Sequence, residues 1–437
     1  MPPTPPLRPA SAPSRLRLVF STVPLLAVSV LSACGGGSDG ADASADAMPG
    51  DAARDGAPHD ATSEAGPDGG NPREGGVDGG GPSLRDRIAA RVAPLVDPRR
   101  ASNDFEKTVG MVVTVVSADD AFVMGFGARR EGGTEPPDET TPYQLGSVTK
   151  VLTGLLLAEA EERSAAAADD LVEDLWPAVA GANGTAGVTL QHLATHHSGL
   201  PYMPDNLPMT DPLAPAAGYT TDALRDFLFG LPRPVTPGGS YVYSNTGIGL
   251  LGVALGEREE AASYHDLLSA RLLVPAGIED GLWGQLAAVP AAAASRAATG
   301  YVRTRSGWRE GRFVSMGALA PAGEAVATGG ALRTLLLALT GRGAPALQPA
   351  IERALTPRAD AEPPARIGYG IEVHPVDDGR GPSFEKAGST RGGFTTYLAF
   401  RRDPPVGVVV TVDAQPFRAT RGVARDVLRL LSEDAVD

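Results

Sequence analysis

The stretch YQLGSVTKVLTGLLLAEA, residues 143–160, places a lysine three residues after a serine. The run after Ser147 is apolar on nearly every side, which predicts a buried helix in the middle of a domain. The chain holds 38 lysines and arginines, of which only three are lysines. Arginine keeps its proton at any cellular pH, whereas a desolvated lysine can lose it. Lys150 is therefore a candidate base.

Ser147 is the matching candidate nucleophile. If Ser147 opens the helix, Lys150 lies one turn later on the same face. The dipole and unpaired N–H groups of a helix start favour an incipient alkoxide, and a neutral lysine can take the serine proton. The alternative is a serine that caps the helix beside a surface lysine. The apolar surroundings argue against it, because a buried lysine needs partners.

A second segment, PGGSYVYSNTGIGLLG (residues 237–252), carries Tyr243, Ser244 and Asn245 in a loop that leads into an apolar helix. A tyrosine hydroxyl near two lysines is pushed toward phenolate and can act as a general base. Asn245 can orient an amide substrate or hold Lys150. The alternative is a tyrosine that packs its ring and an asparagine that caps the helix.

A third segment, FEKAGSTRGGFTTYLAF (residues 384–400), places Lys386 on a predicted strand, followed by Gly388 and Ser389. A strand edge offers N–H groups to a substrate, and glycine permits close approach. We expect the N–H groups of Ser389 and Ser147 to form an oxyanion hole. The alternative is a strand lysine that points to solvent, as the third lysine, Lys107, is expected to do.

The remaining pattern predicts strands at both ends of a helical middle. Helices are expected at 85–96 and 418–435, and mostly helical structure at 160–340. Residues 109–132 are expected to form two strands joined by a turn at 118–120. Four more strands are expected at 366–376, 383–390, 394–400 and 406–414, with a hairpin turn at 401–405. This order predicts an α/β (α+β) fold. One antiparallel sheet is built from both termini and flanked by helices, with a mostly helical subdomain inserted.

Composition narrows the class of protein. The chain has 437 residues, 42% of them hydrophobic, and a net charge of −14. That charge argues against a nucleic-acid partner, which requires clustered lysine and arginine. Residues 35–83 carry ten acidic residues and two arginines among glycine, alanine and proline. Such a segment buries too little surface to fold, so residues 34–83 are predicted to be a flexible acidic tether.

Residues 1–33 have the architecture of a secretory signal. Three arginines precede a short apolar core that ends in LSAC at residues 31–34, where Cys34 is the only cysteine of the chain. This end resembles the bacterial lipobox, which implies that Cys34 is acylated and anchors the protein to the membrane. Gly35 in the next position implies the outer membrane, facing the periplasm. The alternative is an ordinary cleavable signal with a stray cysteine.

Together the three segments resemble the serine β-lactamase and penicillin-binding-protein superfamily. Within this superfamily, the segments resemble the class C branch, which includes related DD-peptidases and family VIII esterases. LQHLATHHSGLP (residues 190–201) is similar to that branch's LLTHTSGLP, and KAGSTRGGFTTYLAF (residues 386–400) to its KTGSTGGFGAYVAF. The resemblance runs from about Val109 to the C-terminus. It implies one hydrolase domain, residues 84–437.

The resemblance also implies roles for the candidate residues. Ser147 would be the acylated nucleophile. Lys150 and Tyr243 would share proton transfer, and Tyr243 would activate the deacylating water. Asn245 would contact the amide side chain of the substrate. Lys386 would tune Tyr243 and attract the substrate carboxylate.

No cofactor and no metal are implied, and we expect a monomer. His192, His196 and His197 raise the alternative of a zinc site, but the glutamate of an H-E-x-x-H motif is missing. The three histidines match the family's structural turn instead.

One position departs from the family pattern. Ala387 stands where the family usually has a threonine, whose hydroxyl helps to bind the carboxylate of a β-lactam or a D-Ala-D-Ala stem. The departure leaves three hypotheses open. The first is an acyl-transfer hydrolase of peptidoglycan D-Ala-D-Ala peptides or β-lactams, and the second is a carboxylesterase on the same scaffold. The third is a non-catalytic envelope-binding protein, which would not need Ser147, Lys150, Tyr243 and Lys386 together.

Overall fold

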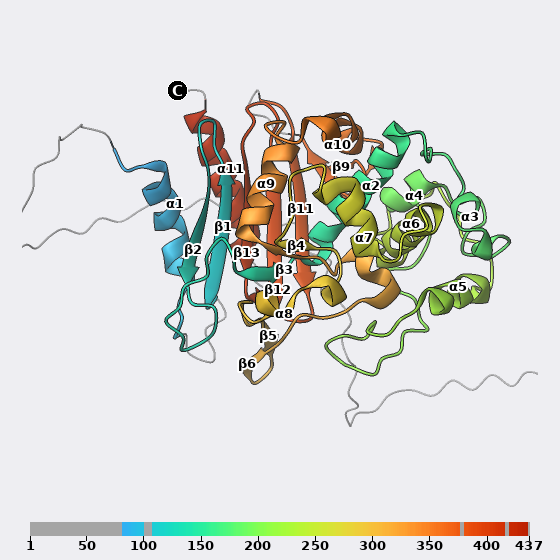
Figure 1. Cartoon of the computed structure of the whole chain (residues 1–437), viewed down its shortest axis with the longest axis horizontal. Coiled ribbons are helices and arrows are strands. Elements are labelled where there is room, and N and C mark those ends of the chain that lie inside the picture. Colours follow the sequence, from blue (N-terminus) through green and yellow to red (C-terminus); the bar gives the residue numbers. More distant parts are fainter. Residues whose placement is uncertain (1–80, 100–106, 376–379, 416–418, 436–437) are drawn as a thin grey trace, which may run out of the picture. The chain divides into compact units, whose positions relative to one another are not determined.

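The computed structural model describes residues 81–99, 107–375, 380–415 and 419–435 (Figure 1). The chain divides into two units, Met1–Val77 and Asp78–Asp437, and all described residues belong to the second. The predicted signal segment and Cys34, and the tether up to residue 80, lie outside the described residues. Within the described ranges, no helix combines the length and the apolar character that crossing a membrane requires.

An eight-stranded antiparallel sheet forms the centre of the second unit (Figure 1). Its strands lie in the order β2 (Ala121–Gly127), β1 (Gly110–Val116), β13 (Gly407–Val412), β12 (Phe394–Phe400), β11 (Ser383–Thr390), β10 (Glu372–His374), β9 (Arg366–Ile367) and β8 (Ala359–Asp360). β1 pairs with β13 from Met111 opposite Val412 to Val116 opposite Gly407. The predicted sheet built from both ends of the domain is confirmed.

Helices cover both faces of this sheet. They are α1 (Leu84–Val92) and α11 (Ala419–Asp434) on one face and α9 (Gly329–Leu339) on the other. Val113 and Val115 of β1 belong to the apolar cluster of α1 and α11. Thr114, which points the other way, donates a hydrogen bond to the Gly329 carbonyl of α9 at 3.4 Å. Both faces of β1 are buried, which explains its nearly continuous apolar sequence.

Between β2 and β8 the regular structure is mainly helical, as predicted. Its helices are α2 (Thr149–Glu162), α3 (Val172–Leu175), α4 (Leu190–Ala194), α5 (Thr221–Gly230), α6 (Asn245–Arg258), α7 (Tyr264–Leu268), α8 (Ala291–Ala294), α9 and α10 (Gln348–Leu355). In Figure 1 most of these helices lie together to one side of the sheet, while α9 lies in front of the sheet. The inserted helical subdomain is therefore confirmed.

Seven short strands were not predicted from the sequence. One is β8, at the edge of the main sheet. The other six are β3 (Pro142–Gln144), β4 (Leu282–Trp283), β5 (Tyr301–Thr304), β6 (Gly307–Glu310), β7 (Val326–Thr328) and β14 (Ala414–Gln415), and they form the three-stranded sheets β3-β7-β4 and β14-β5-β6. Strands of two to four residues are too short to show an alternating pattern. The single strand expected at 366–376 is also two strands, β9 and β10. A turn separates them, in which the Gly368 N–H donates to the Ile371 carbonyl at 2.9 Å.

The two predicted hairpin turns are confirmed. Val116 pairs with Ala121 across the turn at 118–120. Phe400 pairs with Gly407 across the turn at 401–405.

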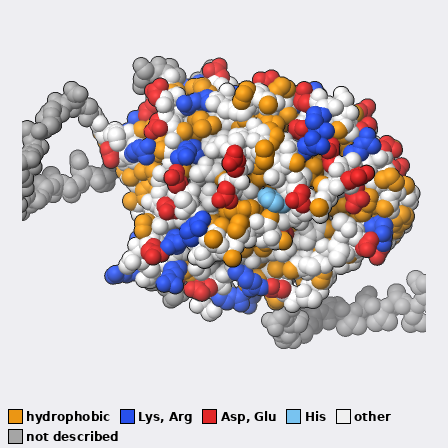
Figure 2. Space-filling model, in the orientation of Figure 1, with side chains coloured by type: hydrophobic (Ala, Val, Ile, Leu, Met, Phe, Trp, Pro, Cys, Tyr) orange, Lys and Arg blue, Asp and Glu red, His pale blue; other side chains and the backbone are white. Residues whose placement is uncertain are grey.

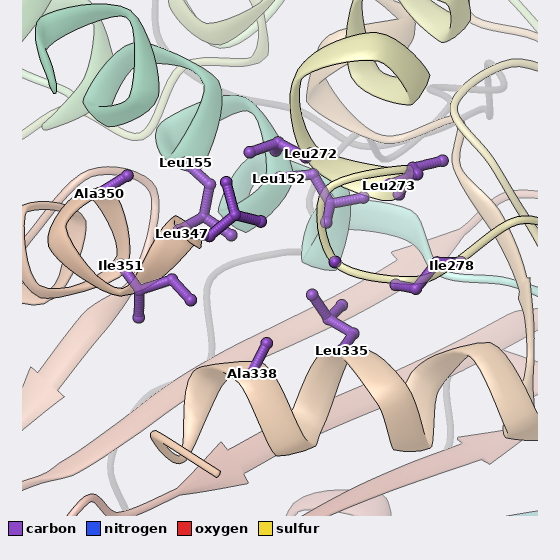
Figure 3. Close-up of a pocket in the computed structure, with 11 residues that line it drawn as sticks. Leu152, Leu155, Leu272, Leu273, Ile278, Leu335, Ala338, Leu347, Ala350 and Ile351 are labelled. Carbon is purple, nitrogen blue, oxygen red and sulfur yellow. The ribbon is translucent and has the colours of Figure 1, made fainter. Parts of the chain in front are cut away.

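A small apolar cavity of about 20 Å³ lies beside α2 (Figure 3). Eleven aliphatic side chains line it: Leu152, Leu155, Leu272, Leu273, Ala276, Ile278, Leu335, Ala338, Leu347, Ala350 and Ile351. They come from α2, α9, α10 and the segments between them. Side chains of α9 and α10 therefore hold α2 in place by apolar packing.

Charged side chains of both signs are spread over the face shown in Figure 2, between areas of hydrophobic atoms. Among the described residues, Arg163 forms ion pairs at 2.6 Å with Glu159 and Glu259. Exposed pairs of this kind contribute little to stability, about 0–1 kcal/mol each. The folded part owes its stability mainly to the apolar clusters around the sheet and α2.

Candidate active site

Ser147 lies in a short 3₁₀ turn, η2 (Gly146–Val148), that runs directly into α2. The serine was expected to open the helix itself, and it precedes the first α-helical residue by two positions. Within residues 141–158, Ser147 alone is not fully buried. Ser147 is therefore the residue at which this buried stretch meets solvent.

Lys150 lies in the first turn of α2 and is completely buried. Its Nζ lies 3.0 Å from Ser147 Oγ, 2.6 Å from Asn245 Oδ1 and 2.5 Å from the carbonyl oxygen of Ala322. Three acceptors match the three N–H groups of an ammonium. A neutral amine can equally donate to the two carbonyl-type oxygens and accept the serine proton. The geometry thus serves both protonation states of Lys150.

Tyr243 lies in the loop before α6, between the two buried lysines. Lys150 Nζ is 4.8 Å and Lys386 Nζ is 4.9 Å from the centroid of its ring. The next residue, Ser244, caps α6 by accepting a hydrogen bond from the Gly247 N–H at 2.8 Å. The Tyr243 ring therefore lies close to both buried amines.

Lys386 lies on β11 and is 2% exposed. Its Nζ lies 3.5 Å from Glu372 Oε1, and the other carboxylate oxygen lies 3.2 Å from His374 Nε2. Burial alone would raise the pKa of Glu372, but the charge of Lys386 and the contacts with His374 lower it to about 2. Glu372 is therefore a carboxylate near neutral pH and holds the Lys386 ammonium in place.

Gly388 and Ser389 lie directly against η2. A Cβ atom on Gly388 would lie 2.0 Å from the Leu145 carbonyl oxygen and 3.1 Å from the Ser147 nitrogen, so only glycine fits there. A Cβ on Gly146 would in turn lie 2.5 Å from the Ser389 nitrogen. β10 pairs with β11 only at residues 383–385, which leaves the rest of that β11 edge to η2.

The backbone nitrogens of Ser147 and Ser389 are thus brought to one place. This is the arrangement that an oxyanion hole requires. Ala387, between Lys386 and Gly388, is exposed and offers no hydroxyl.

The structure brings together all seven residues predicted for catalysis and substrate binding: Ser147, Lys150, Tyr243, Asn245, Lys386, Gly388 and Ser389. It adds two groups that the sequence did not indicate. The Ala322 carbonyl carries no side-chain signal, and no sequence motif relates Glu372 of β10 to Lys386.

The three histidines of the 190–201 segment hold separate positions. His192 Nδ1 accepts from the Thr189 N–H at 3.2 Å, and His197 Nδ1 lies 2.7 Å from the Thr195 carbonyl oxygen. His196 is buried, and its ring centroid is 4.5 Å from that of Tyr243. The sequence placed His196 only in a structural turn, but it lies beside the candidate site.

Comparison with known proteins gives matches to a family profile, to curated proteins and to solved structures. The profile of the family described as Beta-lactamase matches residues 89–432. A protein named Beta-lactamase from Escherichia coli (strain K12) is 29% identical over 192 residues, which are 44% of this chain and 46% of that protein. The D-alanyl-D-alanine-carboxypeptidase/endopeptidase AmpH of the same organism is 25% identical over 201 residues, 43% of this chain and 51% of the relative. The chain thus spans about half the length of these curated relatives.

The fold also resembles that of a solved structure. The crystal structure of a class C beta lactamase from Rhodobacter sphaeroides matches with a TM-score of 0.63 and 26% identity. The match covers 74% of this chain and 94% of that chain. It agrees with the predicted combination of an antiparallel sheet and an inserted helical subdomain.

Proposed function

Because this chain belongs to the Beta-lactamase family, we propose that it is a serine hydrolase that forms an acyl-enzyme on Ser147. Its substrates are D-Ala-D-Ala peptides of peptidoglycan, β-lactams, or both. The observation that carries the proposal is the contact of the buried Lys150 Nζ with Ser147 Oγ at 3.0 Å. Tyr243, between Lys150 and Lys386, completes a set of groups able to move the serine proton.

In acylation, Ser147 Oγ attacks the carbonyl carbon of the substrate amide. The hydroxyl proton passes to neutral Lys150 or to the phenolate of Tyr243. The N–H groups of Ser147 and Ser389 stabilise the oxyanion. When the tetrahedral adduct collapses, the C–N bond breaks and the same proton goes to the leaving nitrogen. In deacylation, the Tyr243 phenolate takes a proton from the water that attacks the ester carbon, and this proton passes to Ser147 Oγ as the ester C–O bond breaks.

Lys386 and Asn245 bind the substrate on either side of this centre. The Lys386 ammonium attracts the carboxylate that both D-Ala-D-Ala peptides and β-lactams carry. The Asn245 side-chain amide contacts the amide group on the acyl side. Without a hydroxyl at Ala387 the carboxylate has one donor fewer, which weakens its binding.

A penicillin distinguishes the substrates. We expect the intact mass of the Asp78–Asp437 unit to increase by one penicillin after mixing, because Ser147 opens the lactam ring without a leaving group. A long-lived adduct indicates a penicillin-binding DD-peptidase, and a transient adduct with loss of the drug indicates a β-lactamase. Absence of both the adduct and drug loss would contradict the β-lactam and D-Ala-D-Ala assignment.

Ala387 favours one alternative, a carboxylesterase that uses the same serine. Small esters carry no carboxylate and need no hydroxyl at that position. Hydrolysis of p-nitrophenyl butyrate, in a protein that neither binds nor consumes penicillin, would support the esterase.

We further propose that the enzyme is anchored in the cell envelope, in the outer membrane facing the periplasm, through a lipid on Cys34. The support is the lipobox-like LSAC sequence at residues 31–34. Metabolic labelling with an alkynyl fatty acid is expected to mark the wild type, and Cys34→Ser is expected to lose both the label and the membrane fraction. A Cys34→Ser protein that stays in the membrane fraction would contradict the anchor.

A further inference from the structure

His196 is a buried titratable residue to which the proposed mechanism gives no task. It follows α4 and is 1% exposed. Its backbone has a positive φ of +62°, a conformation that is costly for most residues other than glycine and asparagine. Its ring lies 4.5 Å from the Tyr243 ring and 5.6 Å, edge to face, from the Tyr241 ring.

Two hydrogen bonds tie His196 to the chain on both sides of Tyr243. The His196 carbonyl oxygen accepts from the Val242 N–H at 2.9 Å. Its Nδ1 accepts from the Ser244 N–H at 3.2 Å. His196 therefore bonds to the backbone of the residue before Tyr243 and to that of the residue after it. Its ring also packs against the Tyr243 ring.

We propose that His196 is a positioning residue for Tyr243. Its neutral imidazole, protonated on Nε2, fixes the 242–244 loop so that the phenol stays between Lys150 and Lys386, and protonation of Nδ1 in acid releases this loop. This inference rests on the proposed function in one respect, which is the role of Tyr243 in proton transfer.

The surroundings of the ring favour the neutral form. An imidazole nitrogen accepts a hydrogen bond only when it carries no proton, so Nδ1 is unprotonated in the bond to Ser244. Among the described residues Nε2 has no hydrogen-bond partner. An added proton would therefore break one hydrogen bond without gaining another.

The charged groups around His196 oppose its protonation. Lys386 reaches it from β11, Lys150 reaches it from α2, and His197 is its neighbour in the chain. The Tyr241 and Tyr243 rings, from the loop that it holds, complete the set of titratable groups. Burial first, and then the charges of Lys386, Lys150 and His197, hold the pKa of His196 well below its usual 6.5.

The lowered pKa of His196 makes the folded protein less stable in acid. In the unfolded chain His196 binds a proton near pH 6.5, whereas in the folded protein it does so only at a lower pH. The positioning contacts are thus fully present above pH 6.5. Their contribution to stability decreases as the pH falls from 6.5 toward the folded-state pKa, because the unfolded state binds more protons there.

Two substitutions separate the accepting atom from the backbone conformation. His196→Asn and His196→Gly both tolerate a positive φ, but only asparagine offers an oxygen to the Ser244 N–H. We expect the glycine variant to react with an alkyl fluorophosphonate probe, which labels activated serines, about 10- to 100-fold more slowly. The asparagine variant should stay within a few fold of wild type. Urea unfolding reports the folded fraction, and His197→Asn is the matched control.

The pH profile gives a second readout. We expect the labelling rate of the wild type to decrease more in acid than that of the His196→Asn variant, because the asparagine amide does not titrate. Equal rates for the asparagine and glycine variants, or the same acid limb in His196→Asn and wild type, would overturn the proposal.

An NMR measurement tests the inference without any catalysis. Histidine-ring ¹⁵N spectra, with His196→Asn used to assign the signal, should show a neutral ring protonated on Nε2 that persists as the pH falls below 6.5. A ring protonated on Nδ1, or one that titrates near 6.5, overturns the positioning role. A wild-type protein that no probe labels overturns the proposed function instead, and the NMR result still decides the role of His196.

Discussion

Replacing Ser147 by alanine is expected to abolish covalent labelling by penicillin or by a fluorophosphonate. Turnover should fall by on the order of 10⁴-fold or more, because no other group can form the acyl-enzyme. The alanine fills the same turn without strain, and Lys150 keeps its bonds to Asn245 and to the Ala322 carbonyl. The fold should therefore survive, and the loss should be one of chemistry alone.

Intact-mass spectrometry and steady-state kinetics measure this effect. Ser295→Ala is the matched control, since Ser295 is an exposed serine whose hydroxyl bonds locally to the Ala292 carbonyl at 2.9 Å. That variant should label like wild type. An undiminished adduct in Ser147→Ala would assign the nucleophile to another residue and contradict the mechanism at its first step.

The Lys150→Arg variant is expected to lose about 10³-fold in acylation rate, within the usual range for the loss of a positioned proton-transfer group. The substitution keeps the positive charge, but a guanidinium does not give up its proton at any relevant pH. It is also planar and larger than an ammonium. It cannot direct donors from one point to Ser147, Asn245 and the Ala322 carbonyl, as Nζ does.

Single-turnover labelling measures the acylation rate directly, and thermal unfolding shows whether the larger side chain has disturbed α2. Lys107→Arg makes the same chemical change far from the proposed chemistry, so it should leave the rate unchanged. Near-normal acylation by Lys150→Arg would remove Lys150 from proton transfer and leave that task to Tyr243.

Much of this site could be predicted from the sequence because its parts are short local patterns. The spacing of Ser147 and Lys150 places both on one turn whatever the rest of the chain does. The rarity of lysine directed attention to Lys150 and Lys386. The strand that carries Lys386 is long and bounded by turn residues, so β11 and its neighbour β12 were recognisable.

What escaped prediction depends on contacts between distant segments. The Ala322 carbonyl has no residue signature, and Glu372 reaches Lys386 from a strand of three residues. His196 lies 47 positions before Tyr243 in the printed sequence, and no local pattern relates the two. The buried character of α2 was evident, but the packing of α9 and α10 around it was not.

The pairing of β1 with β13 constrains how this protein can be made. The Thr411 hydroxyl bonds to the Val112 carbonyl across 299 positions of chain. During synthesis the β1–β2 hairpin leaves the ribosome long before its partner strand exists. Until β13 emerges, the apolar faces of this hairpin stay exposed or are shielded by a chaperone. Contacts of such long sequence separation slow folding and extend the period in which aggregation competes with it.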